Sequence, residues 1–308
     1  MHAQLASVDW LAPWWSPWRA VGRRVAARVL QGARVCDALN DEQRDRGAPL
    51  SGAPPTYTPS FSQGLEVRPA TRWATHSGTP WPIQFVPQSA LREGVAYETF
   101  IFESGQVPSR ENLHDFFNGL AWLVFPHTKR RLNTLQYGAL ASGGVQATRG
   151  ALRDALTLFD ENAAIWPCAS GAARYPTMET ASQLIEALRA KQWHRACIEL
   201  RAHWQGNVPV LFGHALLEKL VSPYKSITSH VYIAHTATEN VADCDLDSVV
   251  AAQLSPAELE PKPFIPLPVL GVPLWWAANA DPAFYDDAQV FRAPRDIVLK
   301  TSASTPKP

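Results

Sequence analysis

Residues 110–118 place polar side chains at a spacing that suits proton transfer. Arg110, His114 and Asn118 are four residues apart, so a helix would present them on one stripe. Asp115 flanks that stripe, and a histidine beside a carboxylate can act as acid and base or bind a metal. We therefore predict that His114 and Asp115 are catalytic residues. Arg110 and Asn118 are predicted to bind the substrate, and the alternative is a solvated helix face.

A second stripe begins with Arg149 and Arg153, which share one face of the next predicted helix. Asp160 and Glu161 follow near the end of that helix, where the negative end of the helix dipole disfavours acidic groups and favours a compensating cation or metal. We predict catalytic roles for Asp160 and Glu161. The two arginines are predicted to hold a carboxylate or phosphate, and the alternative is ion pairing with a neighbouring helix.

A third candidate lies in the sequence Phe212-Gly-His-Ala-Leu-Leu-Glu-Lys. His214 and Glu218 stand one helical turn apart and could share a metal or form a histidine–carboxylate pair. Lys219 follows directly. We predict that His214 and Lys219 contribute to substrate binding in the same pocket.

The elements that would position these side chains are mostly helices. Apolar residues recur at helical spacing from Leu113 to Val124, Ser109 is a suitable N-cap, and Pro126 ends the pattern. Similar patterns predict helices over 129–140, 149–160, 179–189, 193–204 and 211–220, and strands over 97–102 and 227–234. The expected fold is mainly α with a few short strands (α+β), with a helical core around a polar pocket and long Pro-rich irregular segments.

The chain is expected to form a single domain over residues 1–308. Its 308 residues are 46% hydrophobic, and no shift in composition divides them. Residues 47–64 hold four prolines and three glycines and are predicted to be an irregular connection, and residues 301–308 a flexible tail. The Trp-rich segment at 10–18 is expected to pack on the body of the protein.

The charge balance and the cysteine spacing indicate which partners and which cellular compartment to expect. With 28 Lys and Arg against 28 Asp and Glu, no nucleic-acid partner is expected. The most apolar stretch, 264–280, contains three prolines, so no transmembrane segment is expected. The four cysteines are spaced by tens of residues, which favours reduced thiols and a cytoplasmic location. Oligomeric state stays open.

Several segments together resemble a family that is known only from its sequences. They include Gln106-Val-Pro-Ser-Arg-Glu-Asn-Leu-His-Asp-Phe-Phe-Asn, Phe125-Pro-His-Thr-Lys, Arg153-Asp-Ala-Leu-Thr-Leu-Phe-Asp-Glu-Asn, Phe212-Gly-His-Ala-Leu-Leu-Glu-Lys and Leu270-Gly-Val-Pro-Leu-Trp-Trp. The resemblance is to the uncharacterised proteobacterial family called domain of unknown function 3025, and it runs from about residue 10 to residue 292. It implies a bacterial protein and brings no activity, cofactor or catalytic residue with it.

A further likeness concerns metal ligands. His114-Asp115, with His76 upstream and Asp160 downstream, is similar to the ligand set of the His-Asp phosphohydrolase superfamily. The sequence departs from that superfamily around His76, where it indicates a loop in place of a helix.

These observations favour a hydrolase or transferase that acts on a small anionic molecule, with a divalent metal as a candidate cofactor. The alternative is a non-enzymatic binding or scaffold protein, whose buried polar residues are structural and whose Trp-rich or Pro-rich segments contact a partner. A cysteine enzyme that uses Cys168 as nucleophile is the third hypothesis.

Overall fold

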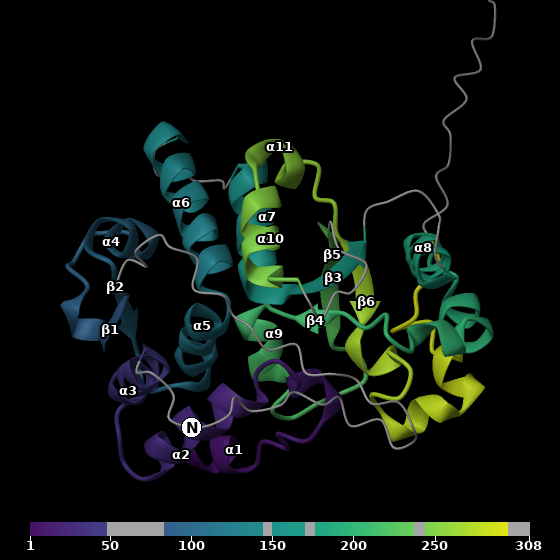
Figure 1. The fold of residues 1–308 in the computed structure, drawn as a ribbon, viewed down its shortest axis with the longest axis horizontal. Helices are drawn as coiled ribbons and strands as arrows, with labels where there is room; N and C mark the ends of the chain where they lie inside the picture. Colours follow the sequence, from purple (N-terminus) through teal and green to yellow (C-terminus); the bar gives the residue numbers. More distant parts are fainter. Residues whose placement is uncertain (48–82, 144–149, 170–175, 237–243, 295–308) are drawn as a thin grey trace, which may run out of the picture.

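The computed structural model describes residues 1–47, 83–143, 150–169, 176–236 and 244–294. The described chain is mainly helical with two small sheets, which confirms the expected fold class. The α-helices are α1 (His2–Ala6), α2 (Arg19–Leu30), α3 (Val35–Gly47), α4 (Tyr97–Ser104), α5 (Leu113–Val124), α6 (Pro126–Gly143), α7 (Ala151–Asn162), α8 (Pro176–Arg189), α9 (His214–Lys219), α10 (Leu246–Gln253) and α11 (Pro256–Leu259) (Figure 1).

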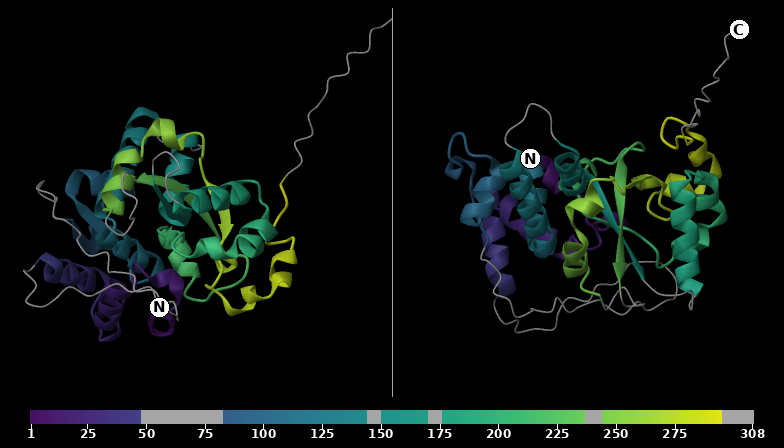
Figure 2. Two further views of the ribbon diagram at one scale, coloured as in Figure 1. Left: turned by 45° about the vertical axis from the view of Figure 1, so that its right-hand side comes forward. Right: turned by 90° about the horizontal axis from the view of Figure 1, so that it is seen from above.

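The larger sheet has the strand order β4-β3-β5-β6 and stands near the middle of the molecule. Its strands are β4 (Val210–Leu211), β3 (Ala163–Ala169), β5 (Thr228–Thr236) and β6 (Ile265–Pro268). The central pair, β3 and β5, is parallel, and both outer strands are antiparallel to their neighbours. Helices α7 and α10 lie on one side of this sheet and α8 on the other (Figures 1 and 2). A separate parallel pair joins β1 (Gln84–Pro87) to β2 (Gln106–Ser109).

The Trp-rich segment packs into the core, as expected. Trp15 stacks on Phe117 of α5 with ring centroids 5.5 Å apart and planes at 10°. Trp18 is completely buried, and its indole N–H donates to the Leu211 carbonyl at 2.9 Å. The N-terminal helices are thereby fixed to α5 and to the start of the segment that carries His214.

Two expected elements around residues 97–112 are corrected by the structure. The predicted strand 97–102 is helix α4, because Phe100 and Ile101 bury one helical face, and Gly105 ends the helix with a left-handed φ of 67°. Ser109 does not cap the next helix, since it ends β2. The cap is Asn112, whose side-chain oxygen accepts from the Asp115 N–H at 2.8 Å.

Two expected helices differ in the structure: one is irregular and the other is shorter. Residues 193–204 contain a π-helical turn (Arg195–Glu199) and a 3-10 turn (Arg201–Trp204). Helix α9 begins at His214, not Leu211, because the Phe212 and Gly213 N–H groups both donate to the Ala163 carbonyl at 2.9 Å. Residues 48–64 and 301–308 lie outside the described residues, so the predicted connection and tail stay predictions.

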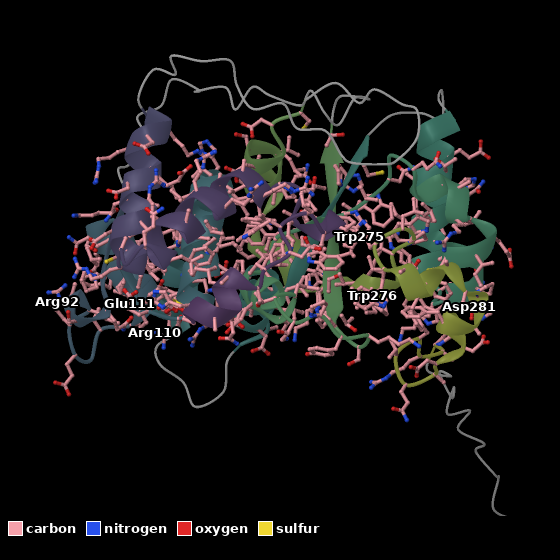
Figure 3. The ribbon with its side chains drawn as sticks, turned by 90° about the horizontal axis from the view of Figure 1, so that it is seen from below. Arg92, Arg110, Glu111, Trp275, Trp276 and Asp281 are labelled. Atoms are coloured by element: carbon pink, nitrogen blue, oxygen red, sulfur yellow. The ribbon has the colours of Figure 1, made fainter. Side chains whose placement is uncertain are left out.

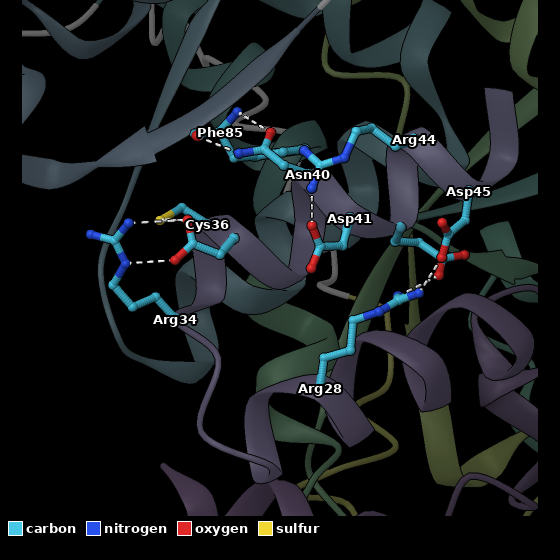
Figure 4. A network of polar contacts seen from close by, with 10 residues as sticks. Arg28, Arg34, Cys36, Asn40, Asp41, Arg44, Asp45 and Phe85 are labelled. Carbon is cyan, nitrogen blue, oxygen red and sulfur yellow. Dashed lines mark hydrogen bonds and ion pairs between the residues drawn. The ribbon is translucent and has the colours of Figure 1, made fainter. Parts of the chain in front are cut away.

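Asn40 of α3 makes two hydrogen bonds to the smaller sheet. Asn40 donates to the Phe85 carbonyl at 2.8 Å and accepts from the Phe85 N–H at 2.9 Å, as Figure 4 shows. The amide thus satisfies both backbone groups of a residue whose side chain is buried.

Replacing Asn40 with Ala should lower the free energy of unfolding by about 1–3 kcal/mol, because two backbone groups of Phe85 lose their partner. Urea unfolding of the full chain measures this. The neighbouring Asp41→Ala change removes only an exposed pair with Arg44 and should cost about 0.5 kcal/mol or less. Equal effects of the two substitutions would contradict the assigned role of Asn40.

Gly213 sets how closely α9 approaches the end of α7. A Cβ atom at this position would lie 2.4 Å from the backbone of Glu161 and Asn162. Gly213→Ala should therefore push the helices apart and destabilise the protein by about 1–3 kcal/mol. At Gly138 in α6 an added Cβ meets nothing within 4 Å, so Gly138→Ala should be neutral or stabilising by up to about 1 kcal/mol. Thermal unfolding of both variants checks the difference.

Candidate functional site

Two histidines from different helices face each other at the centre of the candidate site. The Nε2 atoms of His114 on α5 and His214 on α9 are 3.1 Å apart, and the ring planes meet at 76°. His114 Nδ1 lies 3.1 Å from Glu218 Oε2. On the other side, His214 Nδ1 lies 3.9 Å from Asp160 Oδ1 at the end of α7. The four side chains form a line that starts at Glu218 on α9, crosses to His114 on α5, returns to His214 on α9 and ends at Asp160 on α7.

The line continues inward through a buried lysine on α6. Lys129 Nζ donates to Asp160 Oδ1 at 2.5 Å and to Asn118 Oδ1 at 2.9 Å. It also lies 5.5 Å from the centre of the Trp122 ring. The Asn118 amide donates to the Tyr97 hydroxyl at 2.9 Å. We call this connected set the polar row: Glu218, His114, His214, Asp160, Lys129, Asn118 and Tyr97.

Exposure varies along the polar row. The side chains of Glu218 and His114 are 39% and 33% exposed, that of Asp160 is 20% exposed, and those of His214 and Lys129 are only 7% and 4% exposed. A ligand can therefore reach the Glu218 and His114 end, while the Lys129 end is enclosed by helices.

Burial and neighbouring charges shift the pKa values in the inner half of the row. Burial lowers the pKa of His214 to about 4, although the Asp160 carboxylate opposes this shift. Burial alone would raise the pKa of Asp160, but Lys129 and the two histidines outweigh it and hold that pKa below its usual value. Burial also raises the pKa of Tyr97. At neutral pH, His214 is uncharged and Asp160 is ionised.

Hydrogen-bond chemistry limits where the protons of the two rings lie. An ionised carboxylate only accepts, so His114 Nδ1 carries hydrogen when it bonds to Glu218. One further hydrogen lies between the Nε2 atoms, on either His114 or His214. In the first case His114 is an imidazolium, and in the second both rings are neutral. The two states therefore differ by one proton, and transfer across the contact from the first state would place the charge on His214, which the low pKa of that ring disfavours.

Arg110 and Asp115 form a separate pair next to the row. The Asp115 carboxylate accepts from the Arg110 backbone N–H at 2.6 Å and from its guanidinium at 2.9 and 3.0 Å. Asp115 thus faces Arg110, and the carboxylate that contacts His114 is Glu218. Arg110 itself is largely exposed, at the end of the molecule labelled in Figure 3.

The other predicted site residues lie around α7 and α9. Glu161 is partly buried, with its backbone against Gly213. Arg153 lies in the first turn of α7, and its Nε is buried without a hydrogen-bond partner among the described residues. Lys219 Nζ is 3.4 Å from Asn162 Oδ1. Arg149 lies outside the described residues.

The structure therefore brings together five of the residues singled out in the sequence: His114, Asn118, Asp160, His214 and Glu218. Tyr97 and Lys129 were missed, and Glu218 was paired with His214 when its partner is His114. The position of Lys129 could have indicated its role. It stands in the first turn of a helix, where the positive end of the dipole disfavours a cation, and such a placement indicates a specific anionic partner.

The cysteines show no sign of activation. Burial raises the pKa of Cys168 and raises that of Cys197 to about 12. The pKa values of Cys36 and Cys244 are raised by burial too. A raised pKa disfavours the reactive thiolate, so the structure gives no support to Cys168 as a nucleophile.

The described residues hold neither a cluster of metal-binding side chains nor a membrane-spanning helix. Within that part of the chain, no three or more His, Cys, Asp and Glu side chains are grouped to hold a metal ion. His76 lies outside it, so the resemblance to the phosphohydrolase ligand set is not tested. None of the helices described is long and apolar enough to cross a membrane.

Comparison with known proteins gives one match. A family model described as "Protein of unknown function (DUF3025)" covers residues 83–295. No match was found among curated proteins or among solved structures. The matched range includes every residue of the polar row and more than half of the chain. The chain belongs to the DUF3025 family.

Proposed function

We propose that the protein is an enzyme that hydrolyses or transfers a group on a small anionic molecule, with the His114 and His214 pair as its acid and base. The observation that carries the proposal is the 3.1 Å contact between the two Nε2 atoms. Two imidazoles in this contact must share a hydrogen, and one of them reaches the surface while the other is enclosed.

The chemistry follows from the order of groups along the polar row. A water or hydroxyl nucleophile that binds at the exposed end gives its proton to the Glu218 carboxylate as it attacks the substrate. The leaving group takes up one proton from the Glu218–His114 pair, so the pair ends with the number of protons with which it began. Glu218 and Asp160 face the outer nitrogens of the two rings and stabilise positive charge there.

An anionic substrate is favoured by the charge next to this end. Lys219 follows Glu218 on α9, is exposed, and makes only a long contact of 3.4 Å with Asn162. Its ammonium can therefore turn to a phosphate or carboxylate group of the substrate. A protonated His114 adds a second cation.

The alternative of a scaffold protein has less support among the described residues. A partner-binding aromatic face would expose the tryptophans at both ends of the chain, yet Trp14, Trp15 and Trp275 are all buried. Trp276, labelled in Figure 3, is 36% exposed and lies at the other end of the molecule from Arg110. Leu11 and Leu274, in the same two segments, are exposed too, so a scaffold protein would contact its partner there.

The test is a panel of phosphate and carboxylate esters, assayed with the full chain with and without added Zn²⁺, Mn²⁺ and Mg²⁺. His114→Asn and His214→Asn should each reduce turnover by about 10²–10⁴-fold, the usual contribution of general acid–base catalysis. His194→Asn is the matched control, because His194 forms an exposed pair with Asp286 at 2.7 Å in another part of the structure. It should keep full activity.

Circular dichroism of each variant separates loss of catalysis from loss of fold. Full turnover in folded His114→Asn would refute the proposal. If the wild type neither turns over nor binds any compound in the panel, and both site variants unfold while the control does not, the polar row is structural and the scaffold hypothesis holds.

The neutral state of His214 also predicts how stability depends on pH. Its pKa is about 4 in the folded protein and about 6.5 in the unfolded chain. As the pH falls from 6.5 to 4, the unfolded chain binds the proton first, so this residue lowers the free energy of unfolding by on the order of 2–3 kcal/mol. The slope of stability against pH should be smaller in His214→Gln and unchanged in His194→Asn, as urea unfolding at several pH values would show.

A further inference from the structure

We infer that Lys129 is a positioning residue of the proposed site: by holding Asp160 ionised, it fixes the hydrogen of His214 on Nδ1, so that the Nε2 lone pair faces His114. This inference rests on the proposed function and specifies the resting state of its acid–base pair. It concerns a side chain that is too deeply enclosed to contact substrate itself.

The first step is the environment of His214 Nδ1. This buried atom lies against the end of α7, where a contact with the Asp160 backbone raises the pKa of His214, and the nearest charged group is the Asp160 carboxylate, 3.9 Å away. A hydrogen on Nδ1 would be attracted by the carboxylate, whereas a lone pair there would be repelled. At this distance and in a poorly solvated site, the difference favours the Nδ1–H form.

The second step is the dependence of Asp160 on Lys129. Burial raises the pKa of this carboxyl, and nearby cations lower it. Lys129 supplies one of these cations through the 2.5 Å contact. The ammonium is itself held by Asn118 and lies against the Trp122 ring, so it has little freedom to leave.

The third step is the balance of charge along the polar row. Asp160 and Glu218 contribute two negative charges, and Lys129 contributes one positive charge. When His214 holds its hydrogen on Nδ1, the hydrogen between the two Nε2 atoms belongs to His114, which then carries the second positive charge. All four ring nitrogens face a suitable group, and the row is neutral.

The consequence is a direction for the first proton transfer. The extra proton of the pair lies on the exposed ring, whose Nδ1–H contacts Glu218, so the resting site offers a proton to the substrate at the Glu218 end, and the Nε2 atom of the buried ring accepts the second N–H of His114. The substrate class is then one whose leaving group needs a proton, such as an alkyl ester of a phosphate or carboxylate, in contrast to an activated ester with a good leaving group.

The experiment is ¹⁵N NMR of the histidine rings in the full chain, which distinguishes the Nδ1–H form from the Nε2–H form without any substrate. Wild-type His214 should be Nδ1–H. In Lys129→Met, the ratio of Nδ1–H to Nε2–H should fall by about tenfold or more, because Asp160 loses its charge. Lys225→Met is the control, since it removes a lysine that pairs with Asp287 elsewhere, and it should leave the ratio unchanged.

A second variant keeps the test valid if Lys129→Met alone fails to fold. Lys129→Met leaves a buried carboxylate alone, whereas the double change Lys129→Met with Asp160→Leu removes both charges and replaces them with apolar groups of similar size. The double variant should fold and show the same loss of the Nδ1–H form. The inference is wrong if wild-type His214 is in the Nε2–H form. It is also wrong if the ratio of the two forms is unchanged in the folded Lys129 variants.

The NMR measurement and the ester panel can fail separately. If the ester panel shows turnover that needs His114 and His214 while the NMR ratio does not respond to Lys129, the enzyme proposal stands and the role of Lys129 is wrong. A response of the ratio without turnover of any ester would leave the positioning intact and refute the assigned reaction.

Discussion

The contact between Lys129 and Asp160 is the interaction on which the arrangement of the site depends. Lys129 stands in the first turn of α6 and Asp160 in the last turn of α7, and each placement opposes the dipole of its own helix. Their contact at 2.5 Å compensates both. The N-terminal amides of α6 are satisfied separately, because Asp247 of α10 accepts from the His127 and Thr128 N–H groups. Helices α6 and α7 therefore meet at a specified pair of turns.

That meeting point determines which side chains can reach α5 and α9. With Asp160 fixed, the close approach of Gly213 to the end of α7 places His214 beside the carboxylate. Helix α5 then completes the row from the other side, since Asn118 contacts Lys129 and His114, one turn earlier, contacts His214. One stripe of α5 thus touches both ends of the enclosed part of the site. This explains how three helices and a buried lysine produce one continuous line of polar contacts.

Local periodicity in the sequence was sufficient to find half of this arrangement. The spacing of His114 and Asn118 identified the polar stripe of α5, and the acidic end of α7 indicated a compensating cation. The identity of that cation was not predictable, because it depends on how α6 packs against α7, and Arg153 of α7 was another candidate. The strand expected at 97–102 failed for a related reason: aromatic residues favour strands, but packing of Phe100 and Ile101 made this segment a helix.

The position of His214 is set by the sheet more than by its own helix. Helix α9 has only six residues, too few to be stable alone, and it begins directly after two N–H groups that donate to the Ala163 carbonyl of β3. His214 is therefore anchored through β3 and through the end of α7, which are both buried. Glu218 lies one turn further and is 39% exposed, whereas the residues that follow α9, Leu220 and Val221, are buried. Both ends of α9 are therefore packed against the core, and under the proposed function the substrate would meet the protein at Glu218, with the anchored pair of rings behind it.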